Sequence, residues 1–150
     1  MIFILTAPVR SGKTTSLMKW SEQRDDVQGI LTPVIEGKRV FMNAATKEQF
    51  PMEATDNETA LSVGRFAFSI KGFEKATSII RDAIDKKGWL VIDEIGPLEL
   101  RGEGFHDVLK EVVRRSKENV LLIVREGLVK GVQDYFVPDC LITNSINSIV

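Results

Sequence analysis

Short apolar runs alternate along this chain with segments whose apolar residues recur every three or four positions. Runs of apolar, often β-branched residues predict strands, and such runs cover residues 2–5, 27–35, 38–42, 63–69, 89–92, 120–124 and 140–143. The periodic segments predict amphipathic helices over residues 73–86 and 105–113, and helices are also expected over residues 14–20 and 128–136. Alternating strands and helices predict an α/β protein, in which a mostly parallel sheet carries helices on both faces.

One pair of predicted strands departs from this parallel pattern. A Glu-Gly pair separates the runs 27–35 and 38–42, which predicts an antiparallel β-hairpin added to the sheet. Pro33 inside the first run lacks an N–H donor and therefore predicts an edge position or a bulge. Residues 43–64 are polar and rich in turn residues, and two interpretations of them stay open: a substrate loop or lid, or a disordered surface excursion.

The first predicted strand leads into Ala-Pro-Val-Arg-Ser-Gly-Lys-Thr-Thr, which has the pattern of a phosphate-binding loop, or Walker A motif. Such a loop places backbone N–H groups at a helix N-terminus, where the helix dipole favours an anion. We expect Lys13 to bridge the β- and γ-phosphates and Thr14 to place its hydroxyl on a Mg²⁺ ion. Ala7 stands where the motif usually has glycine, which costs about 1 kcal/mol or more if the backbone there needs a positive φ. The predicted nucleotide-binding residues are Ala7, Pro8, Val9, Arg10, Ser11, Gly12, Lys13, Thr14 and Thr15.

The apolar run 89–92 ends at two consecutive carboxylates, Asp93 and Glu94, which is the Walker B pattern. A buried parallel strand presents its functional side chains at its carboxyl end, beside the phosphate loop. We therefore expect Asp93 to face the Mg²⁺ ion and Glu94 to act as the general base that activates a water. Arg65 is a further candidate for stabilising transition-state charge, and Arg125, at the end of a predicted strand, for sensing the γ-phosphate.

The composition limits the number of domains, the kind of binding partner and the location that we expect for the protein. A chain of 150 residues, 43% hydrophobic and 27% charged, predicts one compact domain over residues 1–150. Twenty basic and twenty-one acidic residues give a net charge of −1, which does not indicate bulk electrostatic binding to nucleic acid. We recognise no membrane-spanning run and no signal peptide, and the single Cys140 fits a reducing compartment, so a cytoplasmic location is expected.

The segment after the second carboxylate resembles a known family. Asp93-Glu94-Ile95-Gly96 followed by Glu99-Leu100 is similar to the Asp-Glu-Ile-Gly-x-x-Glu-Leu signature of the small P-loop nucleoside-triphosphatase family. The resemblance implies a three-layer, RecA-like α/β core and slow, Mg²⁺-dependent hydrolysis of several nucleoside triphosphates. It also implies phosphate and metal roles for Lys13 and Thr14, a metal role for Asp93 and water activation by Glu94. Ala7 and Arg10 stand where members of the family usually have glycines, and Pro97 stands where they commonly have lysine.

Three functional hypotheses follow, and the sequence leaves all of them open. The first is a hydrolase that converts nucleoside triphosphates, ATP and GTP with CTP and UTP as further substrates, to diphosphate and phosphate. The second is a nucleotide or small-molecule kinase on the same core, although no arginine-rich lid is evident. The third is a nucleotide-gated binding module with little turnover. The sequence names neither the preferred base nor a protein partner.

Overall fold

The structure of the protein is a computed structural model that describes residues 1–6 and 13–149. Its strands are β1 (Ile2–Leu5), β2 (Val27–Leu31), β3 (Val34–Ile35), β4 (Lys38–Asn43), β5 (Gln49–Pro51), β6 (Ala60–Val63), β7 (Phe66–Ser69), β8 (Trp89–Ile95), β9 (Asn119–Val124) and β10 (Leu141–Thr143). Its helices are α1 (Lys13–Glu22), α2 (Ile70–Ala83), α3 (Pro97–Leu100), α4 (His106–Arg115), α5 (Val129–Tyr135) and the 3₁₀ helix η1 (Ile146–Ser148). Among these described helices, none is long and apolar enough to cross a membrane.

The main sheet has the strand order β10-β1-β9-β8-β2-β4-β3, with β5 paired to β4. Strands β10, β1, β9, β8 and β2 run parallel, whereas β4 is antiparallel to β2, β3 and β5. Leu5 of β1 is level with Ile123 of β9, and Leu122 is level with Ile92 of β8. Strands β1 and β8 therefore end at the same edge of the sheet, with β9 between them. This edge is called the carboxyl edge below.

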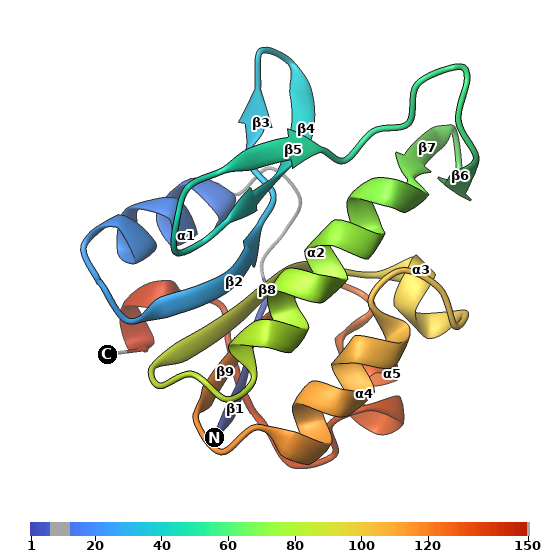
Figure 1. Ribbon diagram of the computed structural model, residues 1–150. Helices are drawn as coiled ribbons and strands as arrows, with labels where there is room; N and C mark the ends of the chain where they lie inside the picture. The colour runs from blue at the N-terminus through green and yellow to red at the C-terminus, as the bar shows by residue number, and fades with distance from the viewer. Residues whose placement is uncertain (7–12, 150) are drawn as a thin grey trace.

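Helices cover both faces of this sheet, as Figure 1 shows. Strand β9 alternates between two apolar clusters, because Leu122 packs with α2 and α4 on one face and Leu121 packs with α1 and η1 on the other. Alternation between two buried faces explains why the parallel strands read as continuous apolar runs. The predicted α/β fold with an added hairpin is confirmed.

The predicted strand over residues 27–35 is in fact two strands, and the prediction of one strand was wrong. Strand β2 ends at Leu31, and β3 begins at Val34. The backbone N–H of Thr32 donates to the carboxylate of Asp93 at 3.1 Å. Pro33 has no N–H and cannot donate a hydrogen bond to a neighbouring strand. The chain therefore leaves the parallel ladder at Thr32 and turns into the hairpin.

The interpretation of residues 43–64 as a disordered surface excursion was wrong for its apolar part. Strand β5 pairs with β4, which sets Phe50 opposite Phe41. The two rings lie 5.4 Å apart, and Phe41 also lies 5.0 Å from Phe73 of α2. This buried aromatic group anchors the β4–β5 pair to the core. The predicted strand over residues 63–69 is a hairpin, β6–β7, that turns at Gly64 with a φ of 58°.

The last of the apolar runs, over residues 140–143, forms a strand, but the interpretation of this run as a core strand was wrong. Strand β10 lies at the end of the sheet and pairs only with β1 in the described part of the chain. The side chains of Leu141 and Ile142 are 51% and 49% exposed. An apolar run therefore identified a strand here but not its burial, because an edge strand can leave its faces open.

Candidate active site

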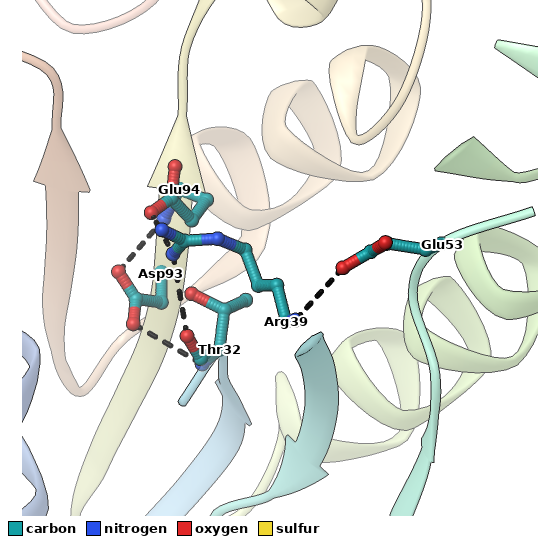
Figure 2. A network of polar contacts seen from close by, with 5 residues as sticks. All are labelled: Thr32, Arg39, Glu53, Asp93 and Glu94. Atoms are coloured by element: carbon teal, nitrogen blue, oxygen red, sulfur yellow. Dashed lines mark hydrogen bonds and ion pairs between the residues drawn. The ribbon is translucent and has the colours of Figure 1, made fainter. Parts of the chain in front are cut away.

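Strand β8 carries a β-bulge at the carboxyl edge. Ile92 pairs with Leu122 of β9 and Ile95 pairs with Val124, so β8 has one residue more than β9 over this stretch. Glu94 sits in the bulge with a φ of 66°, in the left-handed region that residues other than glycine rarely adopt. In a regular strand, consecutive side chains point to opposite faces. The bulge instead brings two consecutive carboxylates into one polar network (Figure 2).

The first of these carboxylates, Asp93, is completely buried. One oxygen accepts the Thr32 N–H at 3.1 Å, and the other accepts the Glu94 N–H at 2.9 Å. Burial, followed by the charge of Glu94, raises the pKa of Asp93 above its ordinary value, although the hydrogen bond from the Thr32 backbone N–H opposes the shift. A buried carboxylate of this kind is stabilised in its charged form by a cation placed beside it.

The second carboxylate, Glu94, is held by an arginine from the added hairpin. Arg39 of β4 donates from Nη1 to Glu94 Oε1 at 2.5 Å, and the same nitrogen lies 3.4 Å from the Thr32 carbonyl oxygen. The backbone N–H of Arg39 donates to the Glu53 carboxylate at 2.9 Å. Figure 2 shows the side chain of Arg39 reaching Glu94 at the end of β8, with Thr32 beside it, whereas Glu53 holds the backbone of Arg39 farther away. The Glu94 side chain remains 25% exposed, so a water molecule can reach it.

The oxygen atoms at the carboxyl edge suit a hard cation. The hydroxyls of Thr6, which follows β1, and Thr32, which follows β2, are buried oxygens that accept or donate no hydrogen bond within the described residues. The same part of the chain contains no group of three or more His, Cys, Asp or Glu side chains that could hold a metal. Mg²⁺ is usually bound by one or two carboxylates together with substrate phosphates, and it prefers oxygen ligands. Asp93 with threonine hydroxyls therefore fits Mg²⁺.

The predicted Walker A residues are only partly described. Residues 7–12 lie outside the described residues. Lys13 is the first residue of α1, and Thr14 and Thr15 follow in its first turn, where Thr14 is half-buried and Thr15 exposed. Strand β1, which precedes this motif, ends at the carboxyl edge that also carries Asp93.

The two candidate arginines lie outside the Asp93–Glu94 network. Arg125 directly follows β9 and is exposed, and its N–H donates to the Ile95 carbonyl at 3.3 Å, which places its backbone beside the bulge. Arg65 lies at the turn of the β6–β7 hairpin, with its guanidinium 5.8 Å from the ring centroid of Phe66. None of the polar contacts found among the described residues joins Arg65 to either carboxylate.

A third carboxylate holds the segment that follows β8. Glu99 is 1% exposed, and its two oxygens accept the N–H groups of Gly96 at 2.8 Å and Phe105 at 2.9 Å. Burial raises the pKa of Glu99 to about 7, against the effect of these hydrogen bonds. Gly104 has a φ of 62°, and a Cβ there would lie 2.2 Å from a Glu99 oxygen. Glu99 therefore ties the start of α3 to the start of α4.

Three residues of the network, Thr32, Arg39 and Glu53, were missed by sequence reasoning. Arg39 and Thr32 contact the Walker B carboxylates across 55 and 61 positions of sequence. The only local signal for Arg39 is a charged residue at the beginning of an otherwise apolar strand. That signal does not tell which distant group the charge will meet.

The strand order places β9 between β1, which leads into the Lys-Thr-Thr sequence at the start of α1, and β8, which ends in the carboxylate pair. This arrangement defines a class, the P-loop nucleoside-triphosphatases with a RecA-like core.

Comparisons with known proteins agree with that class. The family model described as NTPase matches residues 2–138. A nucleoside-triphosphatase THEP1 of Methanocaldococcus jannaschii is 30% identical over 144 residues, which cover 86% of this chain and 81% of that protein. The THEP1 of a Thermotoga species is 27% identical over 132 residues, covering 85% and 76%. The chain therefore belongs to the NTPase family, and the predicted family membership is confirmed.

Solved structures show the same fold. The crystal structure of THEP1 from Aquifex aeolicus superposes with a TM-score of 0.77 at 22% identity, covering 96% of this chain and 89% of that one. The solution structure of a human cancer-related nucleoside triphosphatase superposes with a TM-score of 0.70 at 22% identity, covering 95% and 87%. At this identity the likeness concerns the fold.

Proposed function

We propose that the protein catalyses the Mg²⁺-dependent hydrolysis of nucleoside triphosphates, ATP and GTP with CTP and UTP as further substrates, to diphosphate and phosphate. The observation that supports this proposal most strongly is the bulge of β8, which joins Asp93 and Glu94 in one network at the carboxyl edge. A hydrolase of this type needs a metal-binding carboxylate and a base beside each other. The relatives named nucleoside-triphosphatase support the same reaction.

Substrate binding is assigned to the Walker A segment. Backbone N–H groups of the Walker A segment, Pro8 excepted, and the N-terminus of α1 would bind the phosphates, and Lys13 would bridge the β- and γ-phosphates. Asp93 and the Thr14 hydroxyl would hold Mg²⁺, directly or through water. When bound, the ion neutralises charge on the phosphate oxygens.

The chemical step is assigned to Glu94. Its carboxylate would accept a proton from a water whose oxygen attacks the γ-phosphorus. The bond between the γ-phosphorus and the β–γ bridging oxygen breaks, and the diphosphate leaves with that electron pair. The proton held by Glu94 then returns to solvent, which restores the base for another turnover.

Phosphate release from ATP, GTP, CTP and UTP tests this proposal. We expect release with Mg²⁺ and none after the ion is removed with EDTA. Glu94→Gln keeps the shape of the side chain but removes the base, so it should lower kcat by about 10²-fold to 10⁴-fold while nucleotide binding persists. Lys13→Ala should weaken binding itself.

Matched controls come from exposed residues of α1. Glu22→Gln and Lys19→Ala remove the same groups from the far end of that helix, and both should leave turnover unchanged. Absence of phosphate release from all four nucleotides, with binding intact, would contradict hydrolysis and favour transfer to another acceptor.

A further inference from the structure

Arg39 joins the added hairpin to the base of the proposed reaction. Its Nη1 donates to Glu94 Oε1 at 2.5 Å, which is the shortest contact drawn in the network of Figure 2. Among the ion pairs of the described residues, this is the one that reaches the Walker B carboxylates. The side chains of Arg39 and Glu94 are 36% and 25% exposed, so the pair lies at the mouth of the site.

The contact leaves one carboxylate oxygen of Glu94 available. Arg39 engages Oε1, whereas Oε2 accepts no hydrogen bond from the described residues. A general base needs one oxygen directed at the water and a fixed orientation of the whole carboxylate. An arginine that anchors the other oxygen supplies that orientation.

The hairpin holds Arg39 firmly enough for this task. Its backbone N–H is bound by the Glu53 carboxylate, and two positions along β4 the ring of Phe41 is completely buried. Only the end of the side chain is therefore free to move. A positioning group has to be fixed by its own surroundings, and the Glu53 contact and the buried Phe41 ring fix β4 at Arg39 and two residues beyond it.

We infer that Arg39 is a positioning residue that orients the Glu94 carboxylate for attack of water on the γ-phosphate. The inference rests on the proposed function and deepens it. Arg39 acts through Glu94 in this account, and it is not required for binding of the nucleotide. The added hairpin thus completes a site whose other parts belong to the parallel core.

Steady-state kinetics of Arg39→Ala, Arg39→Lys and the wild type test the inference. Arg39→Ala should lower kcat by about 10-fold to 100-fold with KM within about twofold, because a misdirected base slows chemistry without weakening phosphate binding. Arg39→Lys should restore part of kcat, since one ammonium can replace the single Nη1 contact. Lys38→Ala, an exposed neighbour on β4, should behave like the wild type.

A double-mutant comparison separates positioning from direct action on phosphate. In a Glu94→Ala background, where the carboxylate is absent, adding Arg39→Ala should change the single-turnover rate less than about twofold. The affinity of each variant for the Mg²⁺ complex of ATP should match the wild type, and this measurement does not depend on turnover.

Three results would overturn the inference while leaving the proposed hydrolysis intact. They are an unchanged kcat in Arg39→Ala, a faster kcat in that variant, and a loss of nucleotide affinity that indicates contact with phosphate. Absence of turnover in the wild type would instead be a failure of the proposed function, so the two failures are distinguishable.

Discussion

Buried carboxylates in this protein differ in what surrounds each of them. Asp93 lies at the carboxyl edge, beside Thr32 and near the basic side chain of Arg39. Glu99 is enclosed, and its partners are two backbone N–H groups that hold a loop in place. The carboxylate of Asp93 is therefore placed where it can bind a ligand, whereas the carboxylate of Glu99 stabilises the structure of a loop.

The enclosed setting of Glu99 predicts that stability falls as pH rises. Its pKa is about 7 in the folded protein and near 4.5 when unfolded, so the folded state binds the proton more tightly. The contribution of Glu99 to stability should be fully present below about pH 4.5 and should fall by up to about 3 kcal/mol as pH approaches 7, where its decline ends. Glu99→Gln mimics the neutral acid and should lack this component. Urea unfolding of both proteins from pH 5 to 8 measures the difference, and parallel stability curves would contradict the assignment.

At the scale of the elements, β2 links the parallel core to the antiparallel addition. It pairs with β8 through four register positions and with β4 through Ile30 and Leu31. Gly29 of β2 has a φ of 108°, and a Cβ there would lie 2.1 Å from the Val91 carbonyl oxygen of β8. The approach of these two strands requires a residue without a side chain.

Gly29→Ala should therefore destabilise the protein by more than about 2 kcal/mol, because strain at positive φ adds to a collision with backbone. Gly37→Ala is the matched control, since Gly37 in the hairpin turn has a φ of 79° but has no atom within 4 Å of the added Cβ. The control should lose only about 1 kcal/mol. Chemical denaturation of the two variants provides the comparison, and equal losses would show that the backbone approach has no effect.

Elements differ in how far the sequence predicts them. Long apolar runs identified β8 and β9, and helical spacing identified α2 and α4, because each buries a whole face or stripe. Strands β5 and β6 have three and four residues, and α3 has four, which is too short for a period to appear. Their structure depends on distant partners, such as Phe41 opposite Phe50, that local pattern does not contain.

At the scale of the whole molecule, the candidate site depends on topology. Asp93 and Glu94 were predicted, because strand ends of a parallel sheet share one edge. Arg39 was not predicted, because its position follows from the hairpin crossing back over Thr32. The sequence motifs thus predict the carboxylates of the site, which belong to the parallel core. Arg39, which belongs to the hairpin, is found only from the structure.

A site assembled from distant segments should couple nucleotide binding to global stability. A ligand that binds only the folded state stabilises it by about 2.7 kcal/mol at a concentration of 100 Kd. We expect the Mg²⁺ complex of ATP to raise the Tm of Glu94→Gln, which binds without turnover. Adding Lys13→Ala to that variant should abolish the increase. Thermal scans with and without nucleotide measure both, and an equal increase in the Lys13 variant would place binding elsewhere.

The backbone of Glu94 has a consequence for how this protein can evolve. A φ of 66° is a conformation that glycine adopts freely and glutamate adopts at a cost of roughly 1–2 kcal/mol. A laboratory selection that rewards heat resistance alone should therefore favour Glu94→Gly, whereas one that rewards turnover should restore glutamate. Thermal stability therefore favours glycine at position 94 in the bulge of β8, whereas catalysis requires glutamate there.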